Sequence, residues 1–114
     1  MRTLRSFALL VVLGTLGCAD VAGPDSVVVG GACTTDVDCE RRCTHHGEFG
    51  AGMCTVSCIT DNDCPEGAVC LEPDGGICGV SCASDRDCVD FGRAFVCKAK
   101  KRRSGGDALV CRLP

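Results

Sequence analysis

The chain contains no tryptophan and no tyrosine, and phenylalanine occurs only four times in 114 residues. Aromatic side chains bury the largest apolar area per residue, so their scarcity excludes a core built around bulky side chains. The longest apolar run, Phe7 to Leu13, lies near the amino terminus and has seven residues. A membrane-spanning helix needs about 20 apolar residues, so this run is too short to cross a bilayer.

Several chemical signatures are also missing. Cys-x2-Cys does not occur among the thirteen cysteines, which argues against a zinc site and against a thioredoxin-like redox motif. Neither a phosphate-binding glycine loop nor a convincing set of Ser, His and Asp residues for nucleophilic catalysis is visible. We therefore predict a protein that is not an enzyme and that needs no metal or other cofactor.

The first 17 residues are typical of an export signal, because two arginines precede the apolar run and small residues precede Cys18. The sequence TLGC at 15–18 resembles the lipobox of bacterial lipoproteins, in which the Gly–Cys bond is cleaved and the new amino-terminal cysteine carries lipid. This resemblance implies that a lipidated Cys18 anchors the chain in a bilayer of the bacterial cell envelope, and Ala19 after it favours the outer membrane. The alternative is ordinary signal cleavage after Ala19, which would release a soluble secreted protein.

Charge is unevenly distributed along the mature chain. Cleavage before Cys18 leaves 97 residues with ten basic and fifteen acidic side chains, a net charge of −5. Residues 18–97 carry four basic and fourteen acidic side chains, whereas residues 98–114 carry six basic and one acidic. The carboxyl-terminal segment is therefore a separate basic region on an acidic protein.

The twelve cysteines after Cys18 make up about 12% of the mature chain, which indicates a disulfide scaffold in an exported protein. They fall into three groups of four, in which the first gap is always five residues while the second and third gaps vary. A fixed gap beside variable ones indicates one rigid element and two adjustable loops in each repeat.

These groups predict a chain of several small parts. After the export signal at 1–17 we expect a tether at 18–32 and three four-cysteine modules at 33–57, 58–81 and 82–114. The predicted fold class is small, disulfide-rich and mostly irregular, with single helical turns and short β-hairpins. Three valines inside the tether could also pair with a module as a short strand.

A seven-residue phrase opens each group, with CTTDVDC at 33–39, CITDNDC at 58–64 and CASDRDC at 82–88. In each copy a Thr or Ser stands three residues before the second Asp, which is the spacing of a helix capping box, and the acidic residues favour the positive end of the helix dipole. The phrase therefore predicts one capped helical turn in each module. Further turns are predicted at 72–76 and 103–107, where turn-forming residues cluster.

Two known families share parts of this pattern. Cys-x2-Asp-x-Asp-Cys followed by five residues and another Cys is similar to the central stretch of whey-acidic-protein four-disulfide modules. The stretch CITDNDCPEGAVCLEPDGGIC at 58–78 resembles the short tandem cysteine-rich repeats of the Dickkopf amino-terminal type, common in exported lipoproteins of Gram-negative bacteria. This likeness covers residues 33 to about 97. It implies a small irregular fold held by disulfides and no particular molecular activity.

Four cysteines in one module allow three pairings, and the residues alone leave all three open. The resemblance implies that the first cysteine of each module pairs with the third and the second with the fourth. The implied disulfides are Cys33–Cys43, Cys39–Cys54, Cys58–Cys70, Cys64–Cys78, Cys82–Cys97 and Cys88–Cys111.

The sequence KAKKRR at 98–103 places five cations in six residues, inside the longest gap between cysteines of one module. A solvated surface loop is one interpretation. The other is a site for an anionic partner such as a lipid headgroup or an acidic polymer, since Lys and Arg attract phosphates. The candidate anion-binding residues are Lys98, Lys100, Lys101, Arg102 and Arg103. No aromatic residues interleave with them, so a nucleic-acid partner is not predicted.

Two other groups of polar residues could suggest a metal. The aspartate pairs of the three phrases lack the further acidic ligands and the fixed glycine of an EF-hand, so capping is the better interpretation. His45 and His46 lie in a glycine-rich gap, and adjacent side chains usually point apart. We therefore predict no metal site at either place.

These observations lead to two hypotheses about function. The first is a non-enzymatic envelope lipoprotein, anchored through Cys18, whose modules present variable loops to an unidentified protein or glycan ligand. The alternative is a secreted, disulfide-rich protease inhibitor, suggested by the likeness to whey-acidic-protein modules and by basic residues in a bridged loop.

Overall fold

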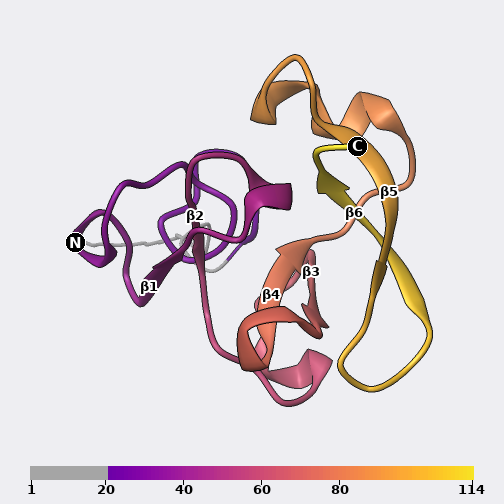
Figure 1. The fold of residues 1–114 in the computed structure, drawn as a ribbon, viewed down its shortest axis with the longest axis horizontal. Helices are drawn as coiled ribbons and strands as arrows, with labels where there is room; N and C mark the ends of the chain where they lie inside the picture. The colour runs from indigo at the N-terminus through magenta and orange to yellow at the C-terminus, as the bar shows by residue number, and fades with distance from the viewer. Residues whose placement is uncertain (1–20) are drawn as a thin grey trace, which may run out of the picture.

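The computed structural model describes residues 21–114, so the predicted export signal and Cys18 lie outside the described residues. The described part is a small disulfide-rich fold in which short antiparallel hairpins and 3-10 turns alternate with irregular segments (Figure 1). The predicted fold class is therefore confirmed. No helix within residues 21–114 has the length and apolar character that a membrane crossing requires.

Three two-stranded antiparallel hairpins form the regular framework, one in each module. Their strands are β1 (Arg42–Thr44) with β2 (Met53–Thr55), β3 (Ala68–Leu71) with β4 (Ile77–Val80), and β5 (Val96–Lys101) with β6 (Asp107–Arg112). In each hairpin the third cysteine of the module lies opposite the fourth, so the three share one register. The turns predicted at 72–76 and 103–107 are present between the strands of the second and third hairpins.

Six disulfides hold these hairpins, and they join the same pairs that the resemblance implies. In each module the first-to-third bond fastens the start of the phrase to one strand, and the second-to-fourth bond fastens its end to the other strand. The Cα–Cα distances across the six bonds range from 5.3 to 6.0 Å. The bonds interlock, so each phrase is tied to both strands of its hairpin.

The phrase starts a capped 3-10 turn in all three modules, as predicted, but in module 3 the helix continues past the phrase to Phe91 and is longer than the single turn expected. The turns are η2 (Asp36–Asp38), η4 (Asp61–Asp63) and η6 (Asp85–Phe91), and each carries a capping box. In η2 the Asp38 carboxylate accepts the N–H groups of Thr34 at 2.8 Å and of Thr35 at 3.2 Å. The same pair of contacts recurs in the other two turns. The capping prediction is confirmed.

The first aspartate of the phrase has a separate role, which the sequence analysis did not identify. The carboxylate of Asp36 accepts the N–H of Cys43 at 2.8 Å. The corresponding aspartates of the other modules bind the N–H of the third cysteine in the same way, also at 2.8 Å. Both aspartates of the phrase therefore accept hydrogen bonds from backbone N–H groups. The residue between them differs among the three copies.

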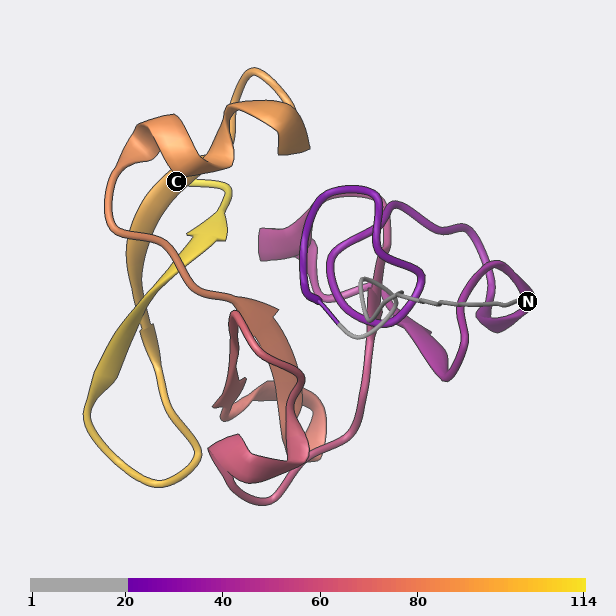
Figure 2. The same cartoon turned by 180° about the vertical axis from the view of Figure 1, so that it is seen from behind.

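The three modules pack against one another rather than forming a string (Figure 1, Figure 2). Their shared core consists of Phe49, Met53, Leu71, Ile77 and Val110, each at most 3% exposed. Met53, Ile77 and Val110 occupy equivalent positions, because each directly precedes the fourth cysteine of its module. One position per repeat therefore supplies three of the five side chains in this core.

The loop between the third and fourth cysteines of each module, which includes η3 (Gly47–Phe49) in module 1 and η5 (Pro73–Gly75) in module 2, contacts another module. In module 1, the carbonyl oxygen of Glu48 accepts the N–H of Leu113 from module 3 at 2.8 Å. In module 2, the Asp74 carboxylate accepts the hydroxyl of Thr44 in β1 at 2.6 Å. In module 3, Arg103 donates its N–H to a carbonyl oxygen of β3 at 3.1 Å. Modules 1, 2 and 3 are thereby joined in a closed ring of contacts.

Residues 21–32, predicted as part of a tether, belong to the packed structure. Val28 and Val29 are buried against cysteines of the second module. Gly31 accepts the N–H of Cys54 at 2.7 Å through its carbonyl oxygen. The three valines form turns and not the alternative strand. The segment packs because Val28 and Val29 meet an apolar surface of the second module, whereas Val27 remains exposed.

Candidate functional site

The basic segment 98–103 is not the loop that was predicted. Residues up to Lys101 belong to β5, and only the last two enter the turn of the hairpin (Figure 1). Alternation along a strand places Lys98 and Lys100 on one face and Lys101 on the other. Lys98 and Lys101 are exposed and form no ion pair within the part of the chain that the structure describes. The five candidate cations therefore do not form one anion-binding cluster.

The other three cations of the segment contact neighbouring modules. Lys100 forms an ion pair with Glu48 of module 1 at 2.5 Å. Arg102 pairs with Asp61 of module 2. The Arg103 guanidinium donates to backbone carbonyl oxygens of module 2. The segment thus fastens the third module to both of the others, a role that its composition alone did not indicate.

Glu48 is the carboxylate at the centre of the contact between modules 1 and 3. Besides Lys100, it pairs with Arg112 of β6 at 3.6 Å. The hydrogen bond from Lys100, together with the positive charges of Lys100 and Arg112, holds the pKa of Glu48 below its ordinary value, although partial burial acts in the opposite direction. The group is therefore ionised at neutral pH, as the contact requires.

Substitution of Lys100 tests this structural role. We expect Lys100→Met to lower the free energy of unfolding by about 1 kcal/mol, because it removes the charge opposite Glu48 while keeping an apolar stem. Lys98→Met is the matched control, since Lys98 is exposed on the same strand. Denaturant unfolding with intact disulfides measures both. Equal losses in the two variants would show that the ion pair contributes nothing.

The second aspartates of the phrases, Asp38, Asp63 and Asp87, have a pKa below the ordinary value of 3.8. In each case two backbone N–H groups donate to the carboxylate and stabilise its charged form. Because the folded pKa lies below the unfolded one, the stabilisation is present above pH 3.8 and is lost as the pH falls through the lower folded value.

Acidification should therefore release the three caps together. We expect the carboxyl groups of Asp38, Asp63 and Asp87 to titrate below pH 3.8 in an NMR experiment, with the capped amides losing protection over the same range. The reduced, unfolded chain is the control, and its aspartates should titrate at ordinary values. Identical titration curves in the folded and unfolded chains would contradict the capping role.

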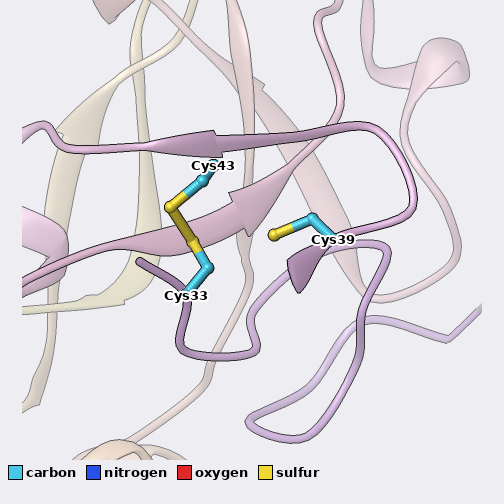
Figure 3. A group of neighbouring side chains, drawn as sticks. All are labelled: Cys33, Cys39 and Cys43. Atoms are coloured by element: carbon cyan, nitrogen blue, oxygen red, sulfur yellow. A yellow bond between two sulfur atoms is a disulfide. The ribbon is translucent and has the colours of Figure 1, made fainter. Parts of the chain in front are cut away.

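Three cysteine sulfurs in each module lie within 4.8 Å of one another. Figure 3 shows the first group, in which the Cys33–Cys43 disulfide lies beside the sulfur of Cys39. Cys39 is itself bonded to Cys54. Every sulfur in these groups belongs to a disulfide, so none of them offers the thiolate that a zinc ion would need.

The two histidines have different surroundings. His45 lies with Nε2 2.9 Å from the carbonyl oxygen of Thr34, which assigns the proton to that nitrogen. His46 faces Phe49 instead, with the ring centroids 6.1 Å apart. Each imidazole therefore contacts a different part of module 1.

A cleft of about 360 Å³ lies where modules 1 and 3 meet the amino-terminal segment. Phe91 and Phe95 line it from module 3, with ring centroids 5.8 Å apart, and residues 49–53 line it from module 1. Asp25 and Asp90 contribute carboxylates. The sequence analysis missed this site because its residues come from three separate segments that only the packing of the modules brings together.

No protein-family model, curated protein or solved structure matches this chain. Its class is therefore defined by its own structure: a small disulfide-rich protein whose three four-cysteine modules close around one core. The cleft between the first and third modules is lined in part by residues of its variable gaps.

Proposed function

We propose that the chain is an exported, non-enzymatic lipoprotein of the bacterial cell envelope that binds a partner through its variable segments. One observation carries the proposal: the fixed phrase supplies the scaffold, while two gaps of variable length line the cleft together with the amino-terminal segment. Residues 49–53 belong to the ten-residue third gap of module 1, and residues 90–95 belong to the eight-residue second gap of module 3. Variable loops on a rigid scaffold are typical of recognition sites.

The chemistry of the cleft supports binding rather than catalysis. Asp25 and Asp90 are its only ionisable lining residues among those described, since Cys33 is in a disulfide. Catalysis by acid–base or nucleophilic steps needs a nucleophile or base held by a second oriented group. Both aspartates are exposed at the surface, and neither is hydrogen-bonded to another described side chain that could orient it.

The anchor rests on the lipobox-like sequence at 15–18. Only Ala19 and Asp20 separate Cys18 from Val21, which already pairs with Glu66 of module 2. Three residue steps span at most about 11 Å, so a lipid on Cys18 would hold the folded modules next to the headgroup layer. The proposed protein is thus a membrane-proximal body without a long stalk.

Replacement of Cys18 tests the anchor. We expect the wild-type protein to fractionate with membranes and to have the mass of residues 18–114 plus lipid. Cys18→Ser should leave the membrane fraction or accumulate as an uncleaved precursor, because serine offers no thiol for lipidation. A conservative control, Ala19→Ser, should remain lipidated. A mature wild-type chain that begins at Asp20 and carries no lipid would contradict the anchor and favour a secreted protein.

Site-specific photo-crosslinking in the native envelope tests binding. Deletion of whole loops is unsuitable, because the loop at 44–53 contains the core residues Phe49 and Met53. We therefore place a photoreactive amino acid at Ala51, which is exposed and lines the cleft, and at Asn62, which is exposed in a capped turn. A crosslinked product from position 51 alone supports the proposal. No product from either position would contradict it.

The protease-inhibitor alternative has less support. An inhibitor presents its reactive residue on an exposed rigid loop, whereas Arg102 and Arg103 contact module 2. Lys98 and Lys101 are the exposed lysines of this segment, so they are the residues to test for an inhibitory role. If the exported protein inhibits a trypsin-like protease and Lys98→Ala or Lys101→Ala abolishes the inhibition, the inhibitor becomes the better-supported function.

A further inference from the structure

We propose that the cleft between modules 1 and 3 binds an organic cation with an apolar body, such as an alkylammonium or guanidinium group. The inference rests on the proposed binding function, to which it adds the chemical class of the ligand. It does not depend on the lipid anchor.

The walls of the cleft are apolar and aromatic. Phe91 and Phe95 are half-buried, so part of each ring remains accessible to a ligand. Phe49 and Met53, each 3% exposed, lie in the shared core and keep this side of the cleft in place. A Cβ on Gly50 would lie 3.4 Å from Cζ of Phe95, so glycine at this position adds no side-chain contact to that ring. The faces of aromatic rings attract cations.

The charged groups of the cleft have one sign. Asp25 and Asp90 line it, and no Lys, Arg or His of the described residues does so. Neither carboxylate forms an ion pair with another described residue. Two negative charges without a counter-charge, next to aromatic rings, attract a cation and repel an anion.

The size of the cleft restricts the ligand further. A volume of about 360 Å³ lies at the low end for small-molecule sites, so it suits an amine or a single side chain. A neutral apolar molecule would contact the same walls without compensating the two carboxylates. The shared ligand chemistry has two possible sources, a free alkylamine or the Lys or Arg side chain of a protein partner.

An NMR titration of the folded mature chain tests the inference. The mature chain has three phenylalanines and no tyrosine or tryptophan, so the ring signals of Phe91 and Phe95 can be followed individually. Three probes of similar size differ in charge: cationic butylammonium, neutral 1-pentanol and anionic pentanoate. A fourth probe, lysine amide with a blocked α-amino group, represents the cationic side chain of a protein partner. We expect the two cations to shift both rings and the glycine amides at 50 and 52, and pentanoate to shift neither. Tighter binding of blocked lysine than of butylammonium would identify a protein side chain as the source, and the reverse a free amine.

Charge-neutral variants locate the effect. Asp25→Asn with Asp90→Asn should weaken cation binding about fivefold at low salt, and Phe95→Leu about threefold. Glu66→Gln with Glu72→Gln is the matched control, because it removes two exposed carboxylates outside the cleft. This control should bind cations as the wild-type protein does.

Four results would overturn the inference. The first three are equal binding of 1-pentanol and butylammonium, unchanged affinity in the doubly neutralised cleft variant, and perturbations that map away from the two rings. The fourth is a failure of all cations to bind; if the crosslink at Ala51 is still present, this result contradicts the inference alone and not the proposed binding function. Loss of both would contradict the two proposals together.

Discussion

Reduction of all six disulfides in buffer without denaturant is expected to unfold residues 21–114 completely. The bonds close segments of 10 to 23 residues, and such bonds contribute roughly 2–4 kcal/mol each. A small domain has a total free energy of unfolding of about 5–15 kcal/mol. Loss of the six bonds therefore removes more stabilising free energy than the folded state has. The apolar core cannot compensate, because only eight apolar side chains other than cysteine are buried among the described residues.

The dispersion of backbone amide signals before and after reduction measures this effect, with alkylation and mass spectrometry to count free thiols. Alkylation of the unreduced protein is the control, and it should label none of the twelve cysteines between residues 33 and 111. Persistence of the native spectrum after complete reduction would show that packing alone holds the fold.

Local chemistry made much of this structure predictable. The seven-residue phrase carries its own turn: the Thr or Ser and the second Asp stand at capping-box spacing, and the structure has the cap in all three copies. The hairpin turn at 103–107 was likewise visible in the run RSGGD, where Gly105 and Gly106 adopt positive φ values of 109° and 71°. Glycine adopts this conformation without steric cost, so the signal was local and physical.

Contacts between modules were not predictable from one sequence. The basic segment illustrates the reason, since composition indicates that Lys100 and Arg102 are charged but not that Glu48 and Asp61 lie opposite them. The cleft has the same origin, because Phe95 reaches residues of module 1 only after the modules have closed. Such pairings depend on distances between segments about 40 or more residues apart, on which local spacing carries no information.

The central core makes the strongest prediction about that closure. Ile77 is fully buried among side chains of all three modules, including Phe49 and Val110. We expect Ile77→Ala to lower the free energy of unfolding by about 2–4 kcal/mol, since it removes buried methyl groups and leaves a cavity. Ile59→Ala is a matched control in the same module, because Ile59 is 67% exposed, and it should change stability by less than about 0.5 kcal/mol. Denaturant unfolding with intact disulfides measures both variants.

Hydrogen exchange in the Ile77→Ala variant distinguishes a closed ring from independent modules. The N–H of Leu113 donates to Glu48, a bond that joins modules 3 and 1 and involves no residue of module 2. If the ring closes cooperatively, Ile77→Ala in module 2 should increase the rate of amide hydrogen exchange at Leu113 as well as in β4. Faster exchange confined to module 2 would mean that the modules are independently stable units. In that case the cleft, which needs modules 1 and 3 held together, would depend on the direct contacts between these two modules, among them the Glu48 ion pairs and the Leu113–Glu48 hydrogen bond.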